Sequence, residues 1–155
     1  MNDLVASIRE RYLHTLDQIA NAARKSNRDP NDIRLVVVTK SQPLEIVQAA
    51  LEAGVKILGE NYPEEGVMKI QSLSGQSGVE WHMIGHVQSR KARLVADRFA
   101  LLHSLDSVKL AQRLDRFAGE GRRVLPVLLE FNVGDRKSTR LNSSHSRASR
   151  MPSSA

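Results

Sequence analysis

Hydrophobic positions in the first part of the chain change from helical to strand spacing. Apolar residues recur every three or four positions near the N-terminus, which predicts an amphipathic helix over about residues 3–25. Asn27 and Pro30 end that pattern. A β-branched apolar run over residues 33–39 follows and predicts a buried strand. The chain therefore starts as a helix followed by a strand.

The same alternation continues along the rest of the chain. Further strands are predicted over residues 55–58, 79–84, 99–103 and 124–133, and helices over residues 43–54, 63–73, 88–98 and 107–118. Pro43 suits a helix start, Gly54 a helix end, and Gly119 and Gly121 are expected to break the last helix. One helix followed by alternating strands and helices predicts an α/β fold with a parallel sheet and right-handed crossovers.

Two architectures share this pattern, the open doubly wound sheet and the (β/α) barrel. No predicted strand is followed by a G-x-G-x-x-G loop, which weakens the dinucleotide-binding form of the open sheet. Eight such units would approach the ~250 residues of a typical barrel, so this chain would hold a little over half of one. Periodicity alone leaves the choice open.

Composition at first favours an anionic partner. The 155 residues include 23 Lys+Arg and 17 Asp+Glu, a formal charge of +6. Residues 135–155 carry five basic residues, one acidic residue and seven serines, a composition typical of disorder or of a nucleic-acid arm. This segment also resembles the translation of a sequencing-library adapter, residue for residue from Asp135 to His145 and from Ser149 to Ala155. We therefore expect a native domain over residues 1–134 and a non-native, disordered tail.

Other compositional features set the expected environment. The chain has no cysteine, which excludes disulfides and thiolate metal sites. Its apolar runs are shorter than the ~20 residues of a membrane span, and its N-terminus lacks the apolar core of a signal peptide. We expect a soluble, cytoplasmic protein.

Polar residues occur at the carboxyl end of every predicted strand, where ligand sites of parallel α/β folds lie. They are Thr39-Lys40, Gly59-Glu60-Asn61, Gly85-His86, His103-Ser104 and Asn132. Strand ends are also polar simply because loops begin there.

Lys40 directly follows the most apolar predicted strand. A partly desolvated amine there would favour the neutral form that condenses with an aldehyde. Two alternatives remain, a lysine that reaches solvent along its apolar stem and a phosphate-binding lysine, although no Walker-type loop surrounds it.

Two further clusters favour structural roles. His82 and His86 lie on a strand and the turn after it, so they do not form the one-faced pair of a helical zinc motif, and no metal site is expected. Glu64 and Glu65 precede Lys69 at helical spacing, which predicts helix-stabilising pairs rather than acid–base chemistry.

Several segments together resemble the pyridoxal phosphate homeostasis protein family, also called the YggS/PROSC family. They are VVVTKSQP (36–43), LGENYPEEGVMKI (58–70), EWHMIGHVQSRKARLV (80–95), HSLDSVKLAQRL (103–114) and LLEFNVG (128–134). The resemblance implies a partial (β/α) TIM barrel of the alanine racemase N-terminal type, with about five strands present.

The resemblance also implies a cofactor, pyridoxal 5′-phosphate (PLP), held as a Schiff base on Lys40. Asn61 and the turn Ile84-Gly85-His86 are implied as walls around the cofactor ring. No role is assigned to the remaining motif residues, which are Glu60, Tyr62, His82, Gln88, Ser89 and Lys91. The family's phosphate-binding segments have no counterpart after Gly134, so weak PLP binding is expected.

The implied function is PLP homeostasis without turnover, hence not an enzyme. A PLP-dependent amino-acid racemase of the same barrel type is the alternative. The expected partners are PLP and apo PLP enzymes as clients, with neither nucleic acid nor a membrane, and the expected state is a monomer.

Overall fold

Every predicted strand–helix unit is present in the computed structural model, which describes residues 2–133. The helices are α1 (Asn2–Lys25), α2 (Leu44–Glu52), α3 (Pro63–Ser72), α4 (Ala92–Arg98) and α5 (Val108–Glu120), with short 3₁₀ helices η1 (Pro30–Asp32) and η2 (Ser89–Lys91). The strands are β1 (Val37–Val38), β2 (Ile57–Glu60), β3 (Glu80–Met83), β4 (Leu101–Leu105) and β5 (Val127–Leu129). The expected domain boundary at Gly134 and the expected tail lie outside the described residues.

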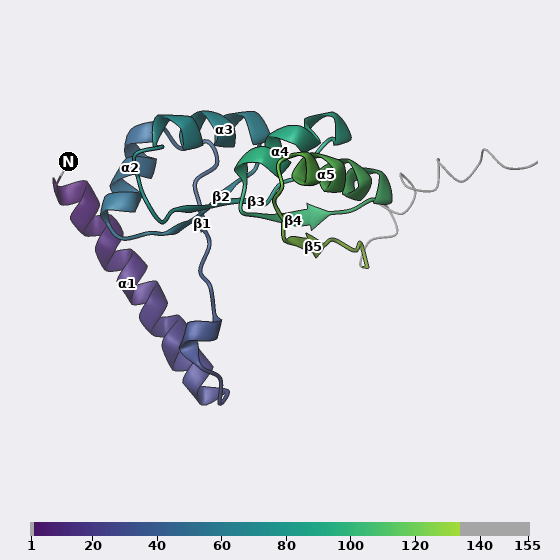
Figure 1. Ribbon diagram of the computed structural model, residues 1–155. Coiled ribbons are helices and arrows are strands. Elements are labelled where there is room, and N and C mark those ends of the chain that lie inside the picture. Colours follow the sequence, from purple (N-terminus) through teal and green to yellow (C-terminus); the bar gives the residue numbers. More distant parts are fainter. Residues whose placement is uncertain (1, 134–155) are drawn as a thin grey trace, which may run out of the picture.

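The strand order decides between the two architectures that the sequence left open. All neighbouring strands pair in parallel, and their order in the sheet is their order in the chain, β1-β2-β3-β4-β5. Helices α2 to α5 lie along the same face of the sheet (Figure 1). A doubly wound sheet reverses its order and carries helices on both faces, whereas a barrel keeps one order and one helical layer. The prediction of a partial (β/α) barrel is confirmed.

The main core lies between the sheet and this helical layer. The registers Leu58↔Trp81 and Met83↔Leu102 place apolar side chains on the helix-facing side of three successive strands. They pack with Phe99 and with residues of the helices in one buried cluster. The opposite side, which becomes the interior of a closed barrel, carries the register Gly59↔His82.

The first predicted strand is much shorter than expected. The sequence predicted a buried strand over residues 33–39, but only Val37 and Val38 belong to β1, and Val38 is half exposed. β1 has one neighbour, and its paired residues lie opposite Leu58 and Gly59 of β2. Ile33 and Leu35 have no strand partner, because continuing the register places them opposite residues before Ile57, where β2 begins. The β-branched run is therefore an edge segment rather than a buried strand.

The last predicted strand is also shorter than expected, and it too lies at an end of the described sheet. Residues 124–133 were predicted as a strand, but β5 covers Val127–Leu129, and within residues 2–133 it pairs with β4 alone, with a shift in register. Its side chains are exposed, and Phe131 beyond it is also exposed. Both end strands of the described sheet thus leave apolar residues in contact with solvent, as expected for an unclosed barrel.

Helix ends follow local chemistry. The Ser107 side chain accepts a hydrogen bond from the Leu110 N–H and caps α5. Gly54 follows α2 with φ of 105°, a conformation that glycine adopts without strain. Gly119 was expected to break the last helix, but it lies inside α5, which ends at Glu120. The predicted helix over residues 88–98 is a 3₁₀ turn followed by α4.

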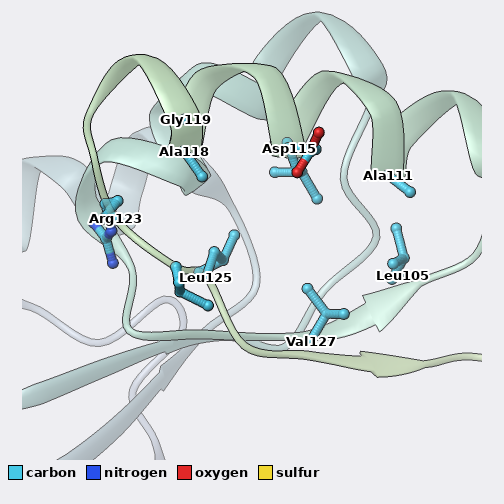
Figure 2. Close-up of a pocket in the computed structure, with 10 residues that line it drawn as sticks. Leu105, Ala111, Asp115, Ala118, Gly119, Arg123, Leu125 and Val127 are labelled. Carbon is cyan, nitrogen blue, oxygen red and sulfur yellow. The ribbon is translucent and has the colours of Figure 1, made fainter.

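A cavity of about 300 Å³ lies between α5 and the two last strands. Figure 2 shows Ala111, Ala118 and Gly119 of α5 facing Leu105, Leu125 and Val127 across it. Small residues on the helix leave this space incompletely filled. None of the predicted site residues lines this cavity.

Candidate functional site

The predicted site residues lie together at the carboxyl ends of β1, β2 and β3. We call this side of the sheet the carboxyl edge. Val38 lies opposite Gly59, and Glu60 lies opposite Met83. Continuing these registers places Lys40 beside Asn61 and Asn61 beside Ile84. Two backbone hydrogen bonds support the continuation, from Thr39 N to Gly59 O and from Ile84 N to Glu60 O.

A cavity of about 560 Å³ opens at this edge. It is lined by Asn61, Ile84, Gly85, His86, Asp106, Glu130, Phe131 and Asn132. The structure therefore brings together four of the five predicted cofactor-binding residues, Asn61, Ile84, Gly85 and His86. Lys40, the fifth, is not among the lining residues. The volume is within the range of small-molecule sites, about 300–1,000 Å³.

Gly85 makes the closest backbone approach in the site. A Cβ atom at this position would overlap the Asn61 carbonyl oxygen and would lie 2.6 Å from Asn61 Oδ1. Only glycine lets the turn after β3 lie this close to the end of β2.

Lys40 is exposed, which corrects the partly desolvated amine expected from its apolar neighbours. The physical reason is the edge position of β1, because no described strand covers its outer side. The residue after it, Ser41, has a left-handed backbone with φ of 59°. The chain thus turns sharply directly after Lys40.

A buried charged cluster contacts the backbone on both sides of Lys40, and of its contacts the sequence predicted only the Glu65–Lys69 pair. Lys69 Nζ lies 2.8 Å from Glu60 Oε1 and 2.7 Å from Glu65 Oε1, and it donates to the Thr39 carbonyl oxygen at 2.7 Å. The Thr39 hydroxyl donates to Glu60 Oε1 at 2.6 Å. Glu60 and Lys69 are 0% and 1% exposed. We call these four residues the Lys69 cluster.

The Lys69 cluster changes two sequence interpretations. Glu60 was grouped with polar strand ends, but it faces α3 and not the cavity. The predicted pair of Glu65 with Lys69 is present, and the Lys69 ammonium lowers the pKa of the Glu65 carboxyl. The signal available in the sequence was a glutamate at a strand position that should face the helices, nine residues before a lysine.

Two histidines meet on the barrel-interior side of the sheet. His82 Nδ1 of β3 lies 3.0 Å from His103 Nε2 of β4. Burial lowers the pKa of both imidazoles. Arg34 pairs with Glu80, whose Oε2 lies 3.5 Å from His82 Nε2, and this guanidinium lowers the pKa of the Glu80 carboxyl. His103 and Ser104, which the sequence placed at a strand end, lie inside β4, and the Ser104 hydroxyl donates to the Gly85 carbonyl oxygen.

His86 and Lys91 bring positive or ionisable groups to the edge of the site. His86 Nδ1 lies 3.0 Å from Asp106 Oδ2, and Lys91 Nζ lies 2.6 Å from Glu64 Oε1. His86 and Lys91 line a second cavity of about 320 Å³ together with Asn61, Tyr62, Pro63 and Gln88. Ser89 lines neither cavity, and its carbonyl oxygen accepts a hydrogen bond from Arg113.

Residues 2–133 contain no group of three or more His, Asp or Glu side chains placed to hold a metal ion. His82 and His86, four residues apart, contact different partners. No helix within the same range has the length and apolar character needed to cross a bilayer.

The chain is similar to proteins of known sequence and structure. The family model described as alanine racemase, N-terminal domain, matches residues 12–141. The pyridoxal phosphate homeostasis protein of Haemophilus influenzae is 39% identical over 122 residues, covering 78% of this chain and 52% of the relative. The protein of the same name from Escherichia coli K12 is 37% identical over 140 residues, covering 89% and 58%.

Two solved structures share the fold. PipY of Synechococcus elongatus, determined with PLP bound, is 32% identical with a TM-score of 0.66, covering 82% of this chain and 63% of PipY. A protein of unknown function from Bifidobacterium adolescentis is 29% identical with a TM-score of 0.77, covering 88% and 59%.

The chain spans a little over half the length of the curated relatives it matches. The resemblance to the pyridoxal phosphate homeostasis proteins is confirmed by this identity, and the match of the family model covers most of the chain. Together with the strand order and the single helical layer, these matches show that the chain belongs to the alanine racemase N-terminal domain family.

Proposed function

We propose that this chain binds PLP as a Schiff base on Lys40 and belongs to a protein that maintains PLP levels without turning over a substrate of its own. The observation that carries the proposal is the place of Lys40. Its exposed amine belongs to the carboxyl end of β1, directly beside Asn61, which lines the cavity at that edge. The similarity to PipY, solved with PLP bound, supports the choice of ligand.

The residues that line the cavity fit the pyridine ring of PLP better than its phosphate. Asn61 and Ile84-Gly85-His86, which line the cavity together, would form the walls around the pyridine ring. The cavity also contains the carboxylates of Asp106 and Glu130, which repel a phosphate. Because these carboxylates disfavour the phosphate end, we expect this chain to bind PLP weakly.

The chemistry assigned to Lys40 is simple amine condensation. PLP supplies an aldehyde, and the neutral Lys40 amine is the nucleophile. Asn61 and His86 would orient the ring, and no residue is required to move a proton on a substrate. This arrangement suits storage and delivery of the cofactor, with apo PLP enzymes as clients.

An absorbance titration tests the proposal. PLP is added to the 155-residue chain and to the variants Lys40→Arg and Lys56→Arg, and the imine band is measured. Lys56 is also exposed, but it directly precedes β2 and so lies at the amino ends of the strands, away from the proposed site. It is therefore a matched control. We expect the original chain and Lys56→Arg to form the band with equal midpoints, and Lys40→Arg to lose it. Equal midpoints for all three proteins would contradict the assignment.

The same preparations distinguish the proposed function from a racemase. Among the cavity-lining residues that the structure describes, His86 and Asp106 form the one acid–base pair in direct contact. If it served catalysis, the PLP-loaded chain would interconvert D- and L-alanine, and His86→Gln would remove that activity. We expect no interconversion above that of free PLP.

A further inference from the structure

The Lys69 cluster lies directly behind Lys40 and contacts the backbone on both sides of it. Lys69 Nζ donates to the Thr39 carbonyl oxygen at 2.7 Å, which is the peptide group that precedes Lys40. Glu65 Oε1 accepts from the Ser41 N–H at 2.7 Å, which is the peptide group that follows it. Both side chains come from α3, so one rigid helix holds both neighbours of Lys40.

The contacts within the cluster fix the position of the Lys69 ammonium group. Its ammonium has three donors, and it meets three acceptors, which are Glu60 Oε1, Glu65 Oε1 and the Thr39 carbonyl oxygen. Glu60 is anchored in β2 and accepts a second hydrogen bond from the Thr39 hydroxyl. Strand β2 and helix α3 are thereby joined through Thr39 to the end of β1.

Fold stability is a weak reason for such a cluster. A buried ion pair contributes little net stability compared with apolar residues of similar volume, because both charges lose their hydration. Ser41 also keeps a left-handed backbone that is costly for a residue with a side chain. Its N–H is held in that conformation by Glu65. Strain and buried charge therefore occur at the same place, next to an exposed lysine.

We propose that the Lys69 cluster is a positioning device for Lys40, with Glu65 and Lys69 as positioning residues that fix the direction in which its amine leaves β1. This inference rests on the proposed Schiff base. In that reaction the Lys40 nitrogen bonds the aldehyde carbon of PLP, and the carbonyl oxygen leaves as water with both amine protons. The cluster touches neither reacting atom. It acts through the two peptide groups that flank Lys40.

The test compares how PLP is distributed over the lysines of the chain. The 155-residue chain is incubated with PLP at a temperature well below the unfolding midpoint, reduced with borohydride, digested and analysed by mass spectrometry. Three variants are treated in the same way. Glu65→Ala removes the acceptor for the Ser41 N–H, Glu65→Gln keeps an oxygen there, and Glu64→Ala removes the same charge from the same helical turn.

The expected result is a loss that depends on the acceptor and not on the charge. In Glu65→Ala the label on Lys40 should fall on the order of ten-fold relative to the label on Lys56, since small misplacements of a reacting group reduce rates strongly. Glu65→Gln should restore most of it, and Glu64→Ala should match the original chain. A general loss of stability would not change the ratio between two exposed lysines in this pattern.

Two results would overturn the inference, and they differ in what else they overturn. If the original chain is labelled on Lys40 and Glu65→Ala keeps the same ratio, the positioning role is wrong and the proposed function stands. If the original chain shows no preference for Lys40, the proposed function fails, and the positioning role fails with it.

Discussion

Gly85 lies against Asn61 so closely that no side chain fits between them. A Cβ atom on Gly85 would overlap the Asn61 carbonyl oxygen, which is backbone and has no rotamer to change. This contact joins the ends of β2 and β3 at the point where the cavity opens. The two residues therefore set the width of the proposed cofactor site.

Replacement of Gly85 by alanine should separate these strand ends. We expect Gly85→Ala to reduce the free energy of unfolding by about 1–3 kcal/mol, the usual range for overpacking, and to weaken PLP binding. Urea unfolding and the absorbance titration measure the two effects. Gly75→Ala is the control, because a Cβ at Gly75 meets nothing within 4 Å, and its unfolding free energy should stay unchanged within about 0.5 kcal/mol. Equal behaviour of the two variants would show that the contact is not restrictive.

Removing one partner of the buried Glu60–Lys69 pair should destabilise the chain strongly. Lys69→Met leaves the Glu60 carboxyl without its ammonium partner, at 0% exposure. We expect a loss of about 3–5 kcal/mol in the free energy of unfolding, measured in urea. The double variant Glu60→Gln with Lys69→Met should recover much of that loss, since no charge of the pair remains buried. A loss below about 1 kcal/mol for the single variant would contradict the burial of the pair.

The histidine pair predicts a dependence of stability on pH. Burial lowers the folded-state pKa of His82 and His103 below the ordinary value of about 6.5. As the pH falls through that value, the unfolded chain takes up protons before the folded chain does, so the free energy of unfolding decreases. The decrease stops once the pH falls below the folded-state pKa values.

Urea unfolding at pH 8, 7, 6 and 5 checks this expectation. The slope between pH 7 and 5 should become smaller in the double variant His82→Gln with His103→Gln. His14→Gln, which replaces an exposed histidine of α1, is the control variant. An unchanged slope in the double variant would mean that these imidazoles do not control the effect.

Gly119 offers a stabilising substitution. It lies inside α5, its backbone is not left-handed, and a Cβ would meet nothing within 4 Å. Gly119→Ala should raise the free energy of unfolding by about 0.5–1 kcal/mol, because glycine loses more backbone entropy in a helix. Gly54→Ala should do the opposite, because its φ of 105° strains any side chain even though space is free. Thermal unfolding of both variants shows whether the two substitutions change the free energy of unfolding in opposite directions.

The sequence predicted the order and type of the elements well, because each helix and central strand carries its own periodic pattern. It failed at β1 and β5, where the apolar runs are long but pairing depends on a neighbour in space. A run of valines specifies an extended segment and not the number of strands beside it. Gly119 was misjudged for a related reason, since a glycine near a helix end breaks the helix only where the backbone needs its freedom.

Part of the candidate site could likewise be predicted from the sequence, and part of it could not. Asn61, Ile84, Gly85 and His86 could be placed together from the sequence, because parallel strands end at one edge and the motifs fix their spacing. The exposure of Lys40 and the burial of Lys69 could not. Lys40 is exposed because β1 lies at the edge of the described sheet, whereas Lys69 is buried because α3 packs it against Glu60 of β2, although its spacing from Glu65 indicates a surface ion pair.

The most direct test of the account is the position of the PLP adduct. The 155-residue chain is incubated with a small excess of PLP, reduced with borohydride and mapped by peptide mass spectrometry. The account predicts a pyridoxyl group mainly on Lys40, with much less on Lys56 at the opposite edge of the sheet. Label spread evenly over the exposed lysines, or concentrated on a lysine other than Lys40, would contradict the proposed site.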